Sequence, residues 1–202
     1  MEQHGATGTR SLRIEGKTVV LDEIRPAYFT DVIRWRNNPA RNRYINQHFV
    51  LTDEQERRWY EETYLKDPSQ GLFVFLDRAT GTPFGTSGWT DYDAGEKRCI
   101  WGRLMAGEDA YQGSVQLIEG ILLAVGYFFD TLGVEKAYSQ IVEKNAASIR
   151  LNHRFGFFEQ PDGPVFADHF DKEADPMVEL VATRDTFEKA RRNIEAFLEE
   201  FA

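Results

Sequence analysis

The sequence has one cysteine, Cys99, among 202 residues, so an internal disulfide framework is excluded and a reducing cytoplasmic location is expected. It also has no apolar run near the ~20 residues that a membrane span needs. The longest such run, Ile118 to Phe129, is interrupted by Glu119, Gly120 and Gly126. The first residues, MEQHGATGTR, contain no apolar signal core, and we expect residues 1–11 to form a flexible leader.

Positive charge is also scarce, since 24 Lys and Arg face 33 Asp and Glu for a net charge of −9. This balance argues against a nucleic-acid partner, because binding to phosphates requires clustered cations. One segment differs, since Arg34, Arg36, Arg41 and Arg43 follow one another without an intervening acid. Two interpretations stay open for this segment: a solvated helix end, or an anion site for a phosphate-bearing small molecule.

The hydrophobic pattern predicts one mixed α/β domain over residues 12–184. Alternating side chains indicate strands at Lys17–Ile24, Leu72–Asp77, Pro83–Tyr92, Lys97–Met105, Ala137–Val142 and Met177–Thr183. Three- and four-residue spacing indicates helices at Pro26–Trp35, after Thr52, at Gln112–Leu132 and at Ala146–Arg154. A terminal helix within residues 185–202, capped by Asp185, should pack on the domain or on a partner subunit, so a homodimer is one expectation.

Two helix starts carry specific signals. Thr52 and Gln55 form a capping box, and the helix they begin should carry Trp59 and Leu65 toward the core. Asn145 occupies an N-cap position directly after a strand, and Ser148 follows one turn later on the same face. A strand end that runs into such a helix start can hold the amide and carbonyl groups of a ligand.

The segment from Glu135 to Phe157 resembles the closing half of the acyl-CoA site in the GNAT superfamily of N-acetyltransferases. The likeness extends over the element order from about Leu12 to Thr183. Within the superfamily, the segments Trp35–Pro39 (WRNNP) and Arg43-Tyr44 and the capped helix are similar to two branches. These are the ribosomal-protein acetyltransferases and the amino-sugar N-acetyltransferases of nonulosonic acid biosynthesis. The resemblance implies a splayed central sheet flanked by helices.

The resemblance also implies acetyl-CoA as acyl donor. Its pyrophosphate would bind the loop before the long helix, which consists of Ala110, Tyr111, Gln112, Gly113, Ser114 and Val115. The family pattern is Gln or Arg, two residues, Gly, one residue, then Gly or Ala, and only Gly113 is kept here. A plain strand-to-helix turn is therefore the alternative. The pantetheine arm would contact Leu104, Met105, Asn145, Ser148 and Asn152.

The reaction needs a base for the acceptor ammonium and an acid for the departing thiolate. Many relatives carry the acid as a tyrosine where this chain has Asn152, so we expect a water or another hydroxyl, with Tyr138 as either a substitute or a core residue. Glu143 is the first candidate base, His48 the second because of its near-neutral pKa, and Asp91 a weaker third.

Substrate contacts are expected between the first two helices and at the end of the third strand. Arg36, Asn37, Tyr44 and His48 offer the mixture of groups that binds a sugar and its phosphates. Trp89 and Tyr92 would stack on a sugar or a nucleobase, or pack against the sheet. The four histidines, His4, His48, His153 and His169, lack zinc-site spacing, so no metal is expected.

The favoured interpretation is an N-acetyltransferase that moves an acetyl group from acetyl-CoA directly to a primary amine of a small molecule. A nucleotide-linked amino sugar is the preferred acceptor. One alternative is acetylation of a protein N-terminus, as in the ribosomal-protein branch. The other is a non-catalytic acyl-CoA-binding module, because the phosphate loop is incomplete and the tyrosine is missing.

Overall fold

The computed structural model describes residues 12–45, 47, 49–169 and 175–201, and these form one α/β domain around a mixed eight-stranded sheet. The spatial order of the strands is β1-β2-β3-β4-β5-β6-β8-β7. They are β1 Arg13–Glu15, β2 Val19–Glu23, β3 Gly71–Asp77, β4 Pro83–Asp93, β5 Arg98–Ala106, β6 Lys136–Val142, β7 Phe158–Glu159 and β8 Met177–Thr183. β1 and β7 were not predicted, because two or three residues are too few to show a period.

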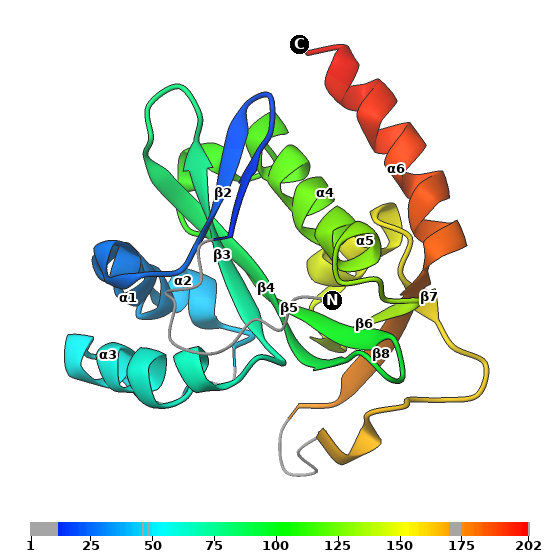
Figure 1. Cartoon of the computed structure of the whole chain (residues 1–202), viewed down its shortest axis with the longest axis horizontal. Coiled ribbons are helices and arrows are strands. Elements are labelled where there is room, and N and C mark those ends of the chain that lie inside the picture. Colours follow the sequence, from blue (N-terminus) through cyan, green and yellow to red (C-terminus); the bar gives the residue numbers. More distant parts are fainter. Residues whose placement is uncertain (1–11, 46, 48, 170–174, 202) are drawn as a thin grey trace, which may run out of the picture.

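Helices cover both faces of the sheet (Figure 1). The α-helices are α1 Phe29–Arg36, α2 Pro39–Asn42, α3 Asp53–Glu62, α4 Val115–Asp130, α5 Ala146–Arg154 and α6 Arg184–Glu199. Short 3-10 helices are η1 Pro26–Tyr28, η2 Tyr64–Lys66, η3 Asp109–Tyr111 and η4 Ala167–His169. β2 shows why two cores form: Val19 and Leu21 pack on the α4 side, while Val20 packs on the α1 and α3 side, as the alternation predicts.

The sheet is interrupted where its parallel pair lies. β5 pairs with β6 from Arg98 opposite Lys136 only as far as Trp101 opposite Ser139, although both strands continue. The neighbouring pair β4–β5 shifts register just beyond that point, and Arg103 takes a left-handed φ of 55° there. This is the geometry of a β-bulge, which bends a strand away from its neighbour. The two parallel strands therefore diverge, as the splayed-sheet expectation requires.

Helix starts follow side-chain caps, with two corrections to the prediction. Thr52 and Gln55 form the expected capping box. Ser114 caps α4, which begins at Val115 rather than Gln112 and ends at Asp130 rather than Leu132. α6 is capped by Thr183 and not by Asp185, because the Thr183 hydroxyl, at the end of β8, accepts the backbone N–H of Thr186. Asp185 instead lies in the first turn, where a carboxylate favours the helix dipole.

Leu65 is a further correction, since it is 41% exposed rather than directed to the core. α3 ends at Glu62, and the tighter turn η2 that follows changes the helical phase. Tyr60 and Tyr64 take the buried positions instead and stack on each other with ring centroids 5.6 Å apart.

The terminal helix α6 covers α4 of the same chain. Phe187 stacks on Phe129 with centroids 5.0 Å apart, and Ile194 is buried. Arg191 adds an ion pair to Asp130 at 2.7 Å. The apolar stripe of α6 is thereby accounted for, in large part, within the domain (Figure 1).

Gly156, which ends α5, provides a stability test. It has a φ of +87°, and a Cβ there would lie 2.6 Å from the Thr186 carbonyl oxygen. We expect Gly156→Ala to lower the unfolding free energy by about 3 kcal/mol, through the left-handed backbone and the clash together. This corresponds to a loss of about 6–12 °C in thermal midpoint.

Gly133→Ala is the matched control. Gly133 has a φ of +71°, but a Cβ there would meet no atom within 4 Å. Only the conformational cost of about 1 kcal/mol should appear, or about 2–4 °C. Equal losses for the two variants would contradict the packing described for Gly156.

Candidate functional site

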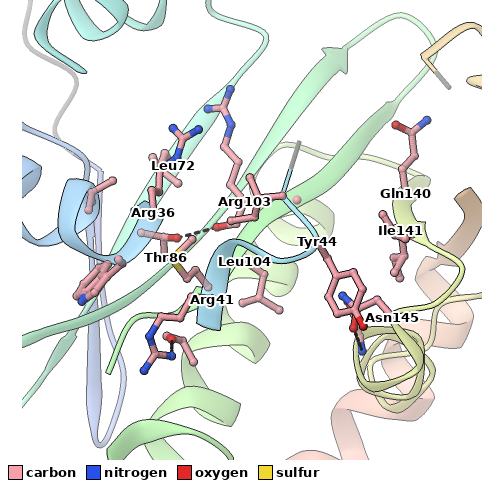
Figure 2. Close-up of a pocket in the computed structure, with 18 of the residues that line it drawn as sticks. Arg36, Arg41, Tyr44, Leu72, Thr86, Arg103, Leu104, Gln140, Ile141 and Asn145 are labelled. Carbon is pink, nitrogen blue, oxygen red and sulfur yellow. Dashed lines mark hydrogen bonds between the residues drawn. The ribbon is translucent and has the colours of Figure 1, made fainter. Parts of the chain in front are cut away.

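A cavity of about 970 Å³ lies where β5 and β6 diverge (Figure 2). Residues 102–106 of β5 form one side and residues 139–142 of β6 the other. The remaining wall comes from α1, α2, the start of α3 and the N-terminus of α5. Beyond Trp101 and Ser139, β5 and β6 no longer pair with each other, so backbone groups that face the gap between them can bind a ligand.

Arg103 enters the cavity because of the bulge in β5. The Thr86 hydroxyl donates to the Arg103 carbonyl at 2.7 Å and holds the bulge in place. Nη2 of Arg103 donates to Gln70 Oε1 at 2.5 Å, and the guanidinium lies over the Trp59 ring at 5.4 Å. Burial is the main cause that lowers the pKa of Arg103, and its Nη1 has no hydrogen-bond partner among the described residues.

The arginine-rich segment has divided roles, which neither interpretation of the sequence anticipated. Arg34 pairs with Glu108 and Asp31 on the outer surface. Arg41 is largely buried, donates to the Ala106 carbonyl and pairs with Asp109 at 2.6 Å. These contacts fix α1 and α2 against the segment that follows β5.

The other two arginines of the segment differ from that pair. Arg36 lines the cavity and donates from Nε to Gln47 Oε1 at 2.9 Å. Its guanidinium and that of Arg103 lie toward the same end of the view in Figure 2, while Arg41 points the other way. Arg43 lies over the Tyr44 ring at 5.3 Å.

Glu56 is a cavity residue that the sequence analysis missed. It is 1% exposed, lines the cavity from α3, and its Oε1 has no hydrogen-bond partner among the described residues. Burial raises the pKa of Glu56, and the positive charges of Arg36 and Arg103 offset only part of this increase. Glu56 resembles the surface acids around it in sequence, but its three- and four-residue spacing to Trp59 and Tyr60 was a signal that it shares their inward face.

Polar groups from α5 line the opposite part of the cavity. Asn145 caps the helix by accepting the Ser148 N–H at 3.2 Å, as predicted. Asn152 is buried and donates to the Ser148 carbonyl at 3.0 Å, while its Oδ1 has no partner in the described chain. Tyr44 extends from the facing wall toward Asn145 in Figure 2. Asp175 is the main cause of the raised pKa of Lys144, and Tyr44 makes a smaller contribution to it.

The cavity thus brings together part of the predicted site. Leu104, Met105, Gln112, Asn145, Ser148, Asn152, Arg36 and Tyr44 line it. Asn37 instead braces its wall, where its amide donates to the Leu51 carbonyl and accepts the Leu51 N–H, both at 2.8 Å. His48 lies outside the described residues.

Trp89 and Tyr92 follow the packing alternative, and not the prediction that they stack on a ligand. Trp89 is buried in the α4-side core, with its ring 5.7 Å from Phe73 and 5.8 Å from Phe128. Tyr92 donates its hydroxyl to the Leu132 carbonyl at 2.9 Å. Neither lines the cavity, because both side chains leave β4 on the face that α4 covers.

The proton-transfer candidates are placed as follows. Glu143 is exposed at the end of β6, its N–H donates to the Pro176 carbonyl at 2.8 Å, and it does not line the cavity. Asp91 is 40% exposed and 4.0 Å from His169. Tyr138 is buried against Phe166, and burial raises its pKa. Sequence alone gave no means of ranking these residues by burial.

Comparison with known proteins identifies the family of this domain. A family model described as an acetyltransferase (GNAT) domain matches residues 18–158. The chain belongs to the GNAT family. The N-acetyltransferase YokL from the SPbeta prophage of Bacillus subtilis (strain 168), itself uncharacterized, is 27% identical over 113 residues. That match covers 56% of this chain and 61% of YokL, so the chain spans less than two thirds of this relative.

Two solved GNAT structures share the fold. Spermidine N-acetyltransferase from Vibrio cholerae, in complex with CoA and spermine, has a TM-score of 0.72 at 15% identity, covering 86% of this chain and 99% of its own. FdhC, a nucleotide-linked sugar GNAT, has a TM-score of 0.71 at 16% identity, covering 94% and 99%. At these identities the likeness shows the fold alone. The family match and the CoA-bound structure support acetyl-CoA as acyl donor.

The loop before α4 fits the phosphate end of such a GNAT donor only in part. Gly113 takes a left-handed φ of +70°, and Ser114 caps α4 by accepting the Leu117 N–H at 3.1 Å. Tyr111 is held away from the cavity, since it stacks on Phe84 at 4.2 Å and donates to Asp77 at 3.1 Å. Of the predicted loop, only Gln112 lines the cavity, and Ala110 and Val115 do not. Phosphate binding here stays a prediction.

Other chemistries find no support in the described chain. No group of three or more His, Cys, Asp or Glu residues there is arranged to hold a metal ion. None of its helices combines the length and the apolar character needed to cross a membrane. Cys99 is fully buried.

Cys99 should be chemically inert in the folded GNAT domain. Burial raises its pKa to about 12, so only about one thiol in 10⁴ is ionised at pH 8. We expect an aromatic disulfide reagent at pH 8 to label the native protein at least ~100-fold more slowly than free cysteine. One equivalent should react after unfolding in guanidinium, and fast labelling without denaturant would contradict the buried position.

Proposed function

We propose that this GNAT protein transfers an acetyl group from acetyl-CoA directly to a primary amine of a small molecule, preferably an amino sugar linked to a nucleotide. The observation that carries the proposal is the cavity at the β5–β6 fork, lined by three arginines and one carboxylate among the described residues. The fork provides the donor side, and the charged wall provides the acceptor side.

The fork suits a long, amide-containing carrier. Acetyl-CoA supplies an acetyl group activated as a thioester. Peptide groups that face the gap, on β5 beyond Trp101 and on β6 beyond Ser139, can bind the amides of its arm. Asn152 lies on the same wall as Asn145, and its Oδ1, which has no partner among the described residues, can accept a hydrogen bond from the arm. These residues would hold the arm of acetyl-CoA, whose thioester would supply the activated acetyl group to the acceptor.

Direct transfer requires the acceptor amine to attack the carbonyl carbon, so that a C–N bond forms while the C–S bond breaks. The ammonium must first lose a proton, and the thiolate gains one afterwards. Asn152 cannot donate that proton as an acid. Glu143 is exposed and does not line the cavity, so its position does not support a role as the base.

The charge of the cavity supports an anionic acceptor over a polyamine. Arg36, Arg41 and Arg103 outnumber Glu56 among the described lining residues. A polyamine such as the spermine bound by the Vibrio enzyme carries several positive charges and would be repelled there. A nucleotide-linked sugar carries a pyrophosphate, which arginine binds in a charge-assisted, bidentate manner.

A thiol-release assay tests the proposal. With acetyl-CoA as donor, we expect nucleotide-linked amino sugars to release CoA at least ~10-fold faster than spermidine or an N-terminal peptide. Calorimetry with CoA alone should show binding. Faster release with the peptide would favour the protein N-terminus instead. Tight CoA binding with no release for any amine would favour the non-catalytic module.

Arg36→Ala tests the acceptor side. Removal of one charge-assisted contact to phosphate should raise KM for the nucleotide-linked sugar by ~10- to 100-fold, because such a contact contributes roughly 1.5–3 kcal/mol. CoA affinity should not change. Arg58→Ala is the control, since Arg58 is exposed on α3 and pairs only with Glu54 among the described residues. An unchanged KM in Arg36→Ala would count against a phosphate-bearing acceptor.

A further inference from the structure

Two buried and unpaired atoms of opposite polarity line the acceptor side of the cavity. Oε1 of Glu56, on α3, has no donor, and Nη1 of Arg103, on β5, has no acceptor among the described residues. Both side chains line the same cavity, and Arg36 of α1 lies within electrostatic range of each. Buried polar atoms nearly always have hydrogen-bond partners. Two such atoms without partners in one cavity therefore indicate a place where a bound ligand supplies the missing hydrogen bonds.

The three side chains are not simply a structural ion cluster. The carboxylate of Glu56 forms no hydrogen bond or ion pair within 4.0 Å with any other described residue, although its backbone N–H donates to the Thr52 carbonyl at the start of α3. The two arginines are instead held by other partners: Arg36 by Gln47, and Arg103 by Gln70 and the Trp59 ring. Their positions are therefore fixed without Glu56, and their remaining N–H groups are available to a ligand.

Glu56 also differs from every other cavity residue in charge. It is the single carboxylate among the described residues that line the cavity. An acceptor amine arrives as an ammonium ion at neutral pH, and only a carboxylate can hold that ion by charge. Burial in turn favours a partner, because an ionised carboxylate away from water is costly until it is paired.

We propose that Glu56 binds the ammonium group of the acceptor while Arg36 and Arg103 bind its anionic group. This inference rests on the proposed function and narrows its acceptor to molecules that carry an amine together with a phosphate or carboxylate. Molecules with amines alone lack the group that the arginines require. Molecules with phosphate alone leave Glu56 unpaired.

A binding experiment tests this without any acetyl transfer. Calorimetry compares UDP-glucosamine with UDP-glucose, which differ by an amine in place of a hydroxyl. Wild-type protein should bind UDP-glucosamine at least ~10-fold more tightly than UDP-glucose, and Glu56→Gln should remove this preference. Arg103→Met should weaken the binding of both ligands to the same degree. Position 103 has a left-handed backbone, and methionine there is no more strained than the arginine it replaces.

Glu61→Gln is the matched control, because Glu61 is exposed on the same helix. It should leave both affinities unchanged. The thermal midpoint of Glu56→Gln should be no lower than that of the wild type, since the net effect of the surroundings is to disfavour the charged carboxylate. A lowered midpoint would assign Glu56 a structural role and overturn the proposal.

Two further outcomes would overturn it. One is equal binding of the two ligands by the wild type, and the other is binding of neither. Failure of the proposed function is a different result, namely CoA binding without thiol release in the acetyl-transfer assay. Selective binding of UDP-glucosamine that depends on Glu56 would stand even then.

Discussion

The structure depends on the point at which β5 and β6 cease to share hydrogen bonds. Parallel pairing ends at Trp101 and Ser139, and the left-handed Arg103 that follows turns β5 away. Such a backbone conformation costs of order 1–3 kcal/mol and persists only where its surroundings hold it. Here the Thr86 hydroxyl does so through the Arg103 carbonyl. One strained residue thus opens the cavity and also places a guanidinium inside it.

Much of the fold was predictable because its signals are local. Asn145 and Gly156 define α5 by the rules of helix caps, and the alternation around Val20 defines both faces of β2. The start of α6 was misplaced because its cap, Thr183, is also the last residue of a strand, and the capping box uses Thr186 rather than an acid or amide. One residue there serves two elements, which a pattern read for each element separately does not reveal.

The site was less predictable because its residues are defined by tertiary packing. Trp89 and Tyr92 have the chemistry of sugar-binding aromatics, yet the face of β4 that carries them is set by α4. Glu56 has the chemistry of a surface acid, and it is buried because α3 packs toward the sheet. Arg103 points into the cavity because of a bulge that has no sequence signature of its own. Residue type alone was a poor guide where long-range packing decides burial.

The charges of the molecule are segregated in a way that favours selectivity at short range. The chain is acidic overall, so it does not attract anions from a distance, and salt screens exposed charges beyond about 10 Å. Under the proposed function, Arg36 and Arg103 act instead at short range, within the cavity that both line, and a charge interaction is stronger at a buried group such as Arg103 than in water. The same fold carries a polyamine in one relative and is linked to nucleotide sugars in another. Under the proposed function, acceptor choice resides in the few side chains of this wall, and not in the sheet that supports them.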